Sequence, residues 1–173
     1  MEKFDLYDVN RIKTGEILER GKPVPENRYR TVVHILVFNS EGKMLIQQRV
    51  STKDSNPDKW DFSVGGSVIA GENSSQGAER ELFEELGMKA DFSHKQPNFT
   101  VNFGCGFDDF YITHSDIDLK DVVLQEDEVQ AVKWATKEEI KKLLIEEKFI
   151  GYRPVLIDFI FDFNRKEYGT FQI

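Results

Sequence analysis

The sequence has one cysteine and no long apolar run. Cys105 alone cannot form an intramolecular disulfide, and it offers no cysteine spacing typical of a structural zinc site. No apolar run approaches the length that a bilayer crossing requires, so we expect no membrane partner. The first ten residues, MEKFDLYDVN, lack the basic flank and apolar stretch of a secretory signal. We therefore expect a cytoplasmic protein.

Basic charge is also in deficit. The 23 Lys and Arg residues stand against 31 Asp and Glu, which gives a formal net charge of -8. Nucleic acid polymers and anionic membranes are bound through positive surface, so we expect neither as a partner. An anionic small molecule would need local help, from a cation or from a few well-placed basic side chains.

The chain of 173 residues is long enough for one domain with a substantial core and too short for two of full size. It has no internal repeat and no low-complexity linker. We therefore predict a single domain over residues 1–173. Residues 1–27 are expected to form an extension with a strand pair, around Leu6 to Val9 and Glu16 to Leu18.

Short segments rich in β-branched and aromatic residues alternate with turn residues along the chain. The expected strands are residues 30–38, 43–48, 60–64, 65–69, two within 99–113, and 129–135. A turn at residues 39–42 should close a hairpin, and Thr136 should begin a helix through about Glu147 with a capping box. A last helix is expected over residues 152–165. This order predicts an α/β protein with a mixed sheet flanked by helices.

The segment GGSVIAGENSSQGAERELFEELGM, residues 65–88, combines a glycine-rich strand with an acidic helix. Asn73 and Ser74 are both good N-cap residues for a helix, and Gln76 is placed to complete a capping box with Asn73. Gly87 can adopt the left-handed conformation that ends a helix. We therefore predict a helix between these caps.

Three carboxylates, Glu81, Glu84 and Glu85, fall on one stripe of this helix, beside an apolar stripe that must face the core: Ala78, Leu82 and Leu86. An acidic helix face is ordinarily just solvated. Like charges three and four residues apart repel, however, by a few tenths of a kcal/mol per pair. A divalent cation would remove that repulsion, and oxygen ligands suit Mg²⁺ or Mn²⁺.

The same residues form the pattern Gly-x5-Glu-x7-Arg-Glu-aliphatic-x-Glu-Glu-x-Gly-aliphatic. Its members are Gly66, Glu72, Arg80, Glu81, Leu82, Glu84, Glu85, Gly87 and Met88. The sequence therefore resembles the Nudix hydrolase superfamily, completely over residues 66–88 and more loosely from Arg30 to about Leu144. The resemblance implies the Nudix fold, a mixed sheet between helices in an α/β/α arrangement, and hydrolysis of a diphosphate linked to another moiety.

The resemblance also implies roles by motif position. The metal ligands would be Glu81, Glu84, Glu85 and the carbonyl of Gly66. Arg80 would orient a glutamate, with Glu72 as its partner across the loop. These residues, with Arg80 and the three glutamates as the catalytic set, would hold Mg²⁺ or Mn²⁺ against a small-molecule diphosphate substrate.

Water that attacks a diphosphate meets a shell of negative oxygens, and bound cations reverse that charge locally. A carboxylate must then accept the proton of the water, and Glu84 or Glu85 can do so if the metal does not saturate it. Because the resemblance implies that the base sometimes comes from a later loop, Asp109 and Glu128 are further candidates. The basic residues that could grip phosphate are Arg49, Lys53 and Lys59.

Two rival functions remain open. Residues 43–67 are closest to Nudix proteins related to isopentenyl-diphosphate isomerase, but Gly65 stands where the isomerase requires a cysteine, and Arg30 and Ser67 stand where it has metal-binding histidines. The second rival is a Nudix-fold module that binds a nucleotide without cleaving it. The intact motif favours hydrolysis over both.

The last predicted helix is rich in Phe and Ile. Its expected buried stripe is Leu156, Phe159, Ile160 and Phe163, and the same apolar excess is compatible with a homodimer. The group attached to the diphosphate is left open, because a nucleoside triphosphate, a nucleotide sugar, a dinucleotide or a prenyl diphosphate all fit. We therefore predict Mg²⁺-dependent hydrolysis of a diphosphate linkage in a nucleoside-diphosphate-type or related organic substrate.

Overall fold

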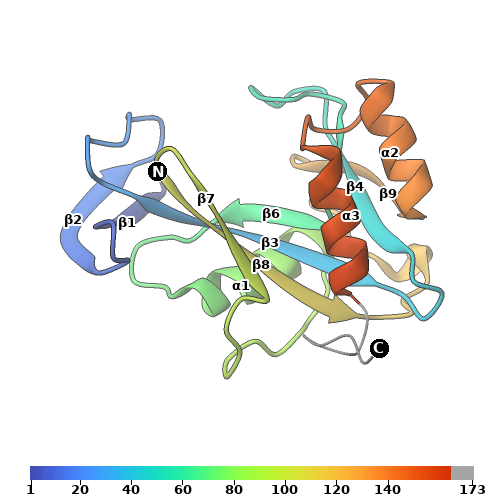
Figure 1. The fold of residues 1–173 in the computed structure, drawn as a ribbon, viewed down its shortest axis with the longest axis horizontal. Helices are drawn as coiled ribbons and strands as arrows, with labels where there is room; N and C mark the ends of the chain where they lie inside the picture. Colours follow the sequence, from blue (N-terminus) through green and yellow to red (C-terminus); the bar gives the residue numbers. More distant parts are fainter. Residues whose placement is uncertain (165–173) are drawn as a thin grey trace, which may run out of the picture. The chain divides into compact units, whose positions relative to one another are not determined.

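The computed structural model describes residues 1–164, and the chain divides into two compact units. Unit 1 comprises residues 1–36 and 64–113, and unit 2 comprises residues 37–63 together with the described residues from His114 onward. Figure 1 labels the helices and strands of both units. The single domain expected over residues 1–173 stays a prediction.

Unit 1 is built around strand β3 (Arg30–Phe38), which lies in this unit up to Leu36. Its other elements are β1 (Lys3–Tyr7), β2 (Lys13–Glu19), β6 (Val64–Ser67), α1 (Ser74–Leu86), β7 (Phe99–Phe103) and β8 (Gly106–His114). β3 has β6 and β8 as neighbours, and β7 pairs antiparallel with β8. The register of β3 with β6 sets Val33 opposite Gly66 and His34 opposite Gly65. The glycine-rich strand is therefore held directly against the central strand of the unit.

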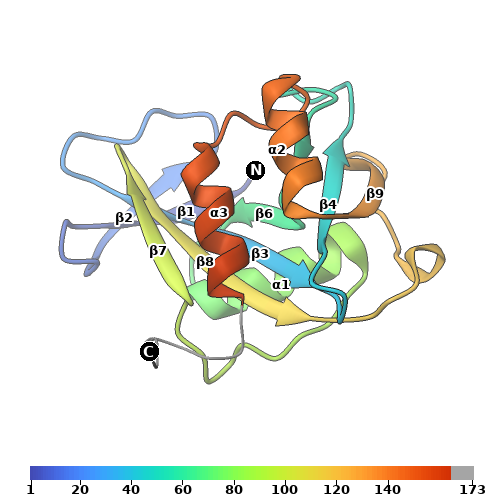
Figure 2. The same cartoon turned by 45° about the vertical axis from the view of Figure 1, so that its right-hand side comes forward.

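Helix α1 packs against β6, and both elements are labelled in Figures 1 and 2. Ala78, Leu82 and Leu86 are completely buried, which confirms the predicted apolar stripe. Burying one leucine side chain stabilises a fold by about 1.5–3 kcal/mol. The acidic stripe thus sits on a helix that core packing fixes in position.

The N-terminal strand pair is present, with a different boundary from the expected one. β1 and β2 pair antiparallel, and Phe4, Leu6 and Leu18 form a small core between them. The first strand ends at Tyr7 instead of continuing to Val9, because the Asp8 carboxylate accepts the backbone N–H groups of Asn10 and Ile12 and closes a turn.

Unit 2 is built around strand β4 (Met44–Arg49), which pairs antiparallel with β5 (Trp60–Asp61) and β9 (Val129–Ala135). The predicted hairpin is present, since Phe38 pairs with Met44. The strand expected over residues 60–64 stops at Asp61. Beyond it, the buried Ser63 hydroxyl donates to the Leu45 carbonyl and accepts the Val37 N–H, in place of strand pairing.

The helices of unit 2 are α2 (Lys137–Ile145) and α3 (Pro154–Phe163), and a short 3₁₀ helix spans Leu119–Asp121. The capping box predicted at Thr136 is present, with Glu139 as its second member. α3 begins at Pro154, a residue favoured in the first turn, and Arg165 of the predicted helix lies outside the described residues. Within residues 1–164, no helix has the length and apolar character needed to cross a membrane.

The stripe predicted on α3 is only partly correct. Ile157 and Ile160 are the buried residues, whereas 43% of Phe159 is exposed and its ring lies against Phe163. Most residues of this helix are apolar, so the sequence pattern does not single out the face that is buried. The predicted stripe therefore included Phe159, which is exposed, and left out Ile157, which is buried.

Candidate active site

The loop between β6 and α1 and the helix itself carry the candidate site, all within unit 1. Asn73 caps α1 and completes the predicted capping box with Gln76, through N–H···O bonds of 3.0 and 2.9 Å. Gly87 ends the helix with φ at 65°, and its N–H bonds to the carbonyl of Phe83. A non-glycine residue would be strained at that angle, so glycine is favoured at this end. The capping box at the start and Gly87 at the end are both set by nearby residues in the sequence.

Arg80 is the centre of a hydrogen-bonded array. Its Nε and Nη2 donate to the two carboxylate oxygens of Glu72 at 2.8 and 3.0 Å, a bidentate ion pair. Its Nη1 donates to Glu81 and Glu84, at 2.9 Å in each case. Nη2 also donates to the carbonyl of Ser67 at 2.9 Å. One guanidinium therefore ties the loop, the strand and the acidic stripe together.

The surroundings of this array shift two ionisation equilibria. Burial by itself would lower the pKa of Arg80, but the carboxylates of Glu72, Glu81 and Glu84 outweigh it and raise that pKa. Burial raises the pKa of Glu81 above its ordinary value, against the opposing effect of Arg80. Arg80 is therefore a permanent cation, and Glu81 is a carboxylate whose charge needs compensation.

The three motif glutamates differ in exposure. The carboxylate of Glu81 lies against Gly66, in the space that a Cβ atom on residue 66 would occupy. Glu85 is 5% exposed, and the side chain of Glu84 is 49% exposed. The stripe thus runs from the protein interior to solvent, with Glu81 beside the backbone of Gly66.

The residues present fit a hard divalent cation. Every expected ligand is an oxygen, and the close approach of Glu81 to Gly66 brings a carboxylate next to the expected carbonyl ligand. In the described part of the chain, no group of three or more His, Cys, Asp and Glu side chains is gathered into a ready metal site. Glu81 and Glu84 instead turn one oxygen each to Arg80, so these carboxylates must reorient to bind a metal.

Asp109, considered above as a base, is engaged by several donors in the structure. It is fully buried, and its carboxylate forms a bidentate pair with Arg11, at 3.0 and 2.6 Å. The hydroxyls of Thr100 and Ser74 also donate to it, each at 2.6 Å. With four donors on its two oxygens and no exposure, Asp109 does not fit a base that takes a proton from water. We assign it to holding Arg11 and the start of α1.

The remaining predicted residues belong to unit 2. Glu128 forms an ion pair with Lys53, so each compensates the charge of the other. Arg49 donates through Nε and Nη2 to the carbonyl of Ser55, at 3.2 and 3.1 Å. The carbonyl of Lys59 accepts the N–H of Arg49. These four residues therefore order the segment that follows β4, and a substrate-binding role for them stays a prediction.

A polar pair lies on the opposite side of β3 and β6 from Gly66. His34 Nδ1 is 2.7 Å from Asp108 Oδ1, and the histidine ring stacks on Phe110. A Cβ atom on Gly65 would lie 2.9 Å from the His34 ring. A cysteine at this position would therefore require the His34 ring to move.

Two contacts of the site could not be predicted from the sequence. Arg11 comes from the turn after β1 and reaches Asp109, 98 residues away. Ser67 contributes its backbone carbonyl to Arg80, and a carbonyl carries no residue-specific signal. Only the spatial arrangement shows either contact.

The comparisons with known proteins agree with this geometry. A family model described as the NUDIX domain matches residues 28–159. The chain belongs to the Nudix family. An uncharacterised Nudix hydrolase of Listeria innocua is 41% identical over 152 residues, which cover 88% of this chain and 90% of the relative. A counterpart in Listeria monocytogenes is 40% identical with the same coverage.

Solved structures confirm the Nudix fold and the α/β class. A crystal structure from Deinococcus radiodurans has a TM-score of 0.75 and 25% identity, covering 91% of this chain and 98% of that one. A MutT protein from Methanosarcina mazei has a TM-score of 0.63 and 25% identity, covering 86% and 100%. The protein is thus a Nudix hydrolase, an enzyme that hydrolyses pyrophosphate bonds in small molecules, in a family that generally uses divalent cations.

Proposed function

We propose that this Nudix hydrolase cleaves a diphosphate linkage in a nucleoside-diphosphate-type or related organic substrate, with Mg²⁺ as its metal and Mn²⁺ as a substitute. The proposed ligands are Glu81, Glu84, Glu85 and the Gly66 carbonyl. The observation that carries the proposal is the array around Arg80, in which one cation aligns the carboxylates of Glu72, Glu81 and Glu84 beside a glycine.

Each residue of the chain has a distinct task in this proposal. Arg80 holds Glu72 and the carbonyl of Ser67 in place, and Glu81 and Glu84 would hold the metal. Gly66 leaves the space that the Glu81 carboxylate needs. Glu84, whose side chain is half exposed, has access to solvent and accepts the proton of the attacking water, with Glu85 as the alternative acceptor.

When bound, the divalent cation neutralises phosphoryl charge and makes water a better nucleophile. This matters especially in a protein of net charge -8, which by itself repels a diphosphate. The array around Arg80 supports the same proposal, because this one arginine pairs with both Glu81 and Glu84 and compensates only part of their charge.

A substrate panel tests the proposal. Nucleoside triphosphates, nucleotide sugars, dinucleoside polyphosphates and prenyl diphosphates are incubated with the protein, in Mg²⁺ and in EDTA, and the products are separated. We expect at least one compound to be cleaved at the diphosphate, only with Mg²⁺. If no compound is cleaved while some raise the melting temperature, the protein binds without turnover and the proposal is wrong.

A further inference from the structure

The N-terminal strand pair, β1 and β2, lies against the loop that joins β6 to α1. The family model begins at residue 28, so both strands precede the part of the chain that it matches. Ile69 of the loop packs on the small core of the pair, which consists of Phe4, Leu6 and Leu18. The strand pair therefore contacts the motif although it lies outside the region that the family model matches.

Three consecutive residues of this loop are bonded to the strand pair. The N–H of Ala70 donates to a carbonyl of β1 at 2.7 Å. The N–H of Gly71 donates to Asp5 Oδ2 at 2.9 Å. The carbonyl of Glu72 accepts from Lys13 Nζ at 3.3 Å. The strand pair thus holds the backbone of each of the three residues.

Lys13 and Asp5 form one unit in these contacts. The Lys13 ammonium lies 2.6 Å from Asp5 Oδ2, the same oxygen that accepts the Gly71 N–H. Only 16% of the Asp5 side chain is exposed, so water screens its interactions less than at an open surface. Gly71 has a φ of 93°, which glycine adopts at little cost, and the bond to Asp5 fixes this permissive residue.

The side chain of Glu72 links this contact to the active site. Its carboxylate forms the bidentate pair with Arg80 and is only 19% exposed. Arg80 donates in turn to Glu81 and Glu84. A shift of the Glu72 backbone would therefore move the Arg80 guanidinium and the two carboxylates that it holds.

A second contact of the strand pair reaches the start of α1. The turn between β1 and β2 carries Arg11, which pairs with the buried Asp109. Asp109 accepts the hydroxyl of Ser74, the first residue of α1, and the Tyr111 hydroxyl donates to Ser74 at 3.1 Å. Glu72 therefore lies between two points of the chain that the strand pair helps to hold.

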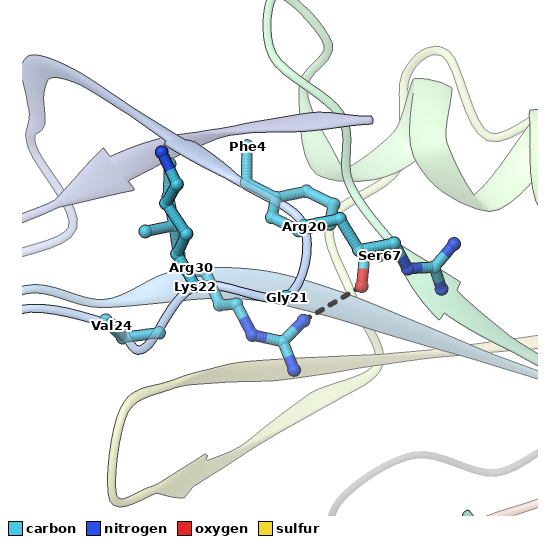
Figure 3. Close-up of a pocket in the computed structure, with 8 residues that line it drawn as sticks. Phe4, Arg20, Gly21, Lys22, Val24, Arg30 and Ser67 are labelled. Carbon is cyan, nitrogen blue, oxygen red and sulfur yellow. Dashed lines mark hydrogen bonds between the residues drawn. The ribbon is translucent and has the colours of Figure 1, made fainter. Parts of the chain in front are cut away.

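A third contact is at the end of β6. Figure 3 shows Phe4 and Ser67 among the residues that line one small cavity, with Arg30 donating to the Ser67 hydroxyl at 2.8 Å. The Arg30 guanidinium lies 5.8 Å from the centre of the Phe4 ring. Because the Ser67 carbonyl accepts from Arg80, this contact also connects β1 to the array around Arg80.

We propose that the N-terminal strand pair is a positioning element of the active site, with Lys13 and Asp5 as its positioning residues. They hold the backbone of the loop at Gly71 and Glu72, and Glu72 in turn sets Arg80 and the carboxylates beside it. Both residues act through Glu72, and neither is a metal ligand. The inference rests on the ligands proposed above.

Two measurements on the intact protein test the inference, and neither requires turnover. Free Mn²⁺ is followed by electron paramagnetic resonance during a titration. In metal-free samples with EDTA, the Arg80 Nε–H signal in the ¹⁵N–¹H NMR spectrum reports whether the bond to Glu72 is kept. The variants are Lys13→Met, Asp5→Asn and the conservative Lys13→Arg. The matched control is Arg28→Gln, which breaks a different ion pair of the strand pair, with Glu16 of β2.

We expect Mn²⁺ affinity to fall about tenfold in Lys13→Met and in Asp5→Asn, as is typical when a residue that orients metal ligands is lost. The Arg80 signal should shift in both variants. Lys13→Arg should keep most of the wild-type affinity, and Arg28→Gln should match the wild type. An unchanged affinity and an unchanged Arg80 signal in Lys13→Met, or an equal loss in Arg28→Gln, overturns the inference.

Two further outcomes separate this inference from the proposed function. Glu84→Gln is titrated in parallel, and if it binds Mn²⁺ as the wild type does, the proposed ligands are wrong and the Arg80 signal alone decides the inference. Wild-type binding of Mn²⁺ without cleavage of any diphosphate contradicts the proposed function, whereas the comparison of the variants still decides the inference. If Lys13→Met does not fold, Asp5→Asn against the same control decides the outcome.

Discussion

The carboxylate of Glu81 occupies the space beside Gly66 that a side chain on residue 66 would need. This contact joins the strand and the helix of the motif at one point. It explains in steric terms why the strand carries glycine here, and it places a carboxylate next to a backbone carbonyl. The first prediction follows from this contact.

Gly66→Ala should displace Glu81 and reduce metal-dependent turnover by about 100-fold or more, because misplaced ligands no longer act together. Steady-state kinetics across a Mg²⁺ titration measures the effect. Gly104→Ala is the control, since a Cβ atom there meets nothing within 4 Å and its φ is not positive. Equal activity in Gly66→Ala and the control would show that the Glu81 contact is irrelevant to catalysis.

Arg80→Gln should reduce both stability and turnover. It breaks the pair with Glu72 and leaves partly buried carboxylates without a counterion, so we expect a loss of about 2–4 kcal/mol in the free energy of unfolding. Denaturant unfolding measures this loss. Arg28→Gln breaks a bidentate pair of similar geometry at the surface and should change stability little. Two variants with the same stability would contradict the central role of Arg80.

Asp109→Asn distinguishes a structural role from a base. Since the carboxylate is fully buried against Arg11, its loss should lower the free energy of unfolding by about 3 kcal/mol. The shape of the pH profile of kcat should stay that of the wild type at a temperature where both proteins are folded. Loss of the acidic limb of that profile, where a carboxylate base would be protonated, with stability unchanged, would restore Asp109 as the proton acceptor.

The N-terminal strand pair should depend on pH through Asp5. Burial by itself would raise the pKa of Asp5, but hydrogen bonds from Lys13 and from the N–H of Gly71 outweigh it and hold that pKa below its usual value. A lowered folded-state pKa stabilises the protein above the unfolded-state pKa, and the contribution is lost as pH falls through the folded-state value.

Asp5→Asn should therefore lower the free energy of unfolding by about 1 kcal/mol at pH 7. The difference from the wild type should shrink as pH falls below about 4. Unfolding in urea across this pH range provides the measurement, with the exposed Asp54→Asn as control. A difference that is constant with pH would mean that the charge of Asp5 contributes nothing.

The features that could be predicted from sequence are those set by nearby residues. The caps of α1 and α2 and the buried stripe of α1 depend on side chains within a few residues of one another, so the pattern was sufficient. The motif also fixed which glutamates share a face. The end of β1 was missed because a single carboxylate, Asp8, captures two N–H groups and turns the chain.

The features that could not be predicted depend on contacts between distant segments. Arg11 and Asp109 are 98 residues apart, and nothing local marks either as a partner of the other. Likewise, the Arg30 guanidinium lies near the rings of Phe4 and Phe103, which are far apart in the sequence. The substrate group, the homodimer and the cytoplasmic location stay predictions.

The most direct test of the central claim is the Mg²⁺-dependent rate of diphosphate cleavage, measured side by side for the wild type, Glu84→Gln, Glu85→Gln and Glu126→Gln. Glu126 is exposed and lies outside the motif, so it controls for the loss of one negative charge. The account predicts a fall of about 100-fold or more in the two motif variants, with Glu126→Gln at the wild-type rate. Undiminished cleavage in both Glu84→Gln and Glu85→Gln would contradict it.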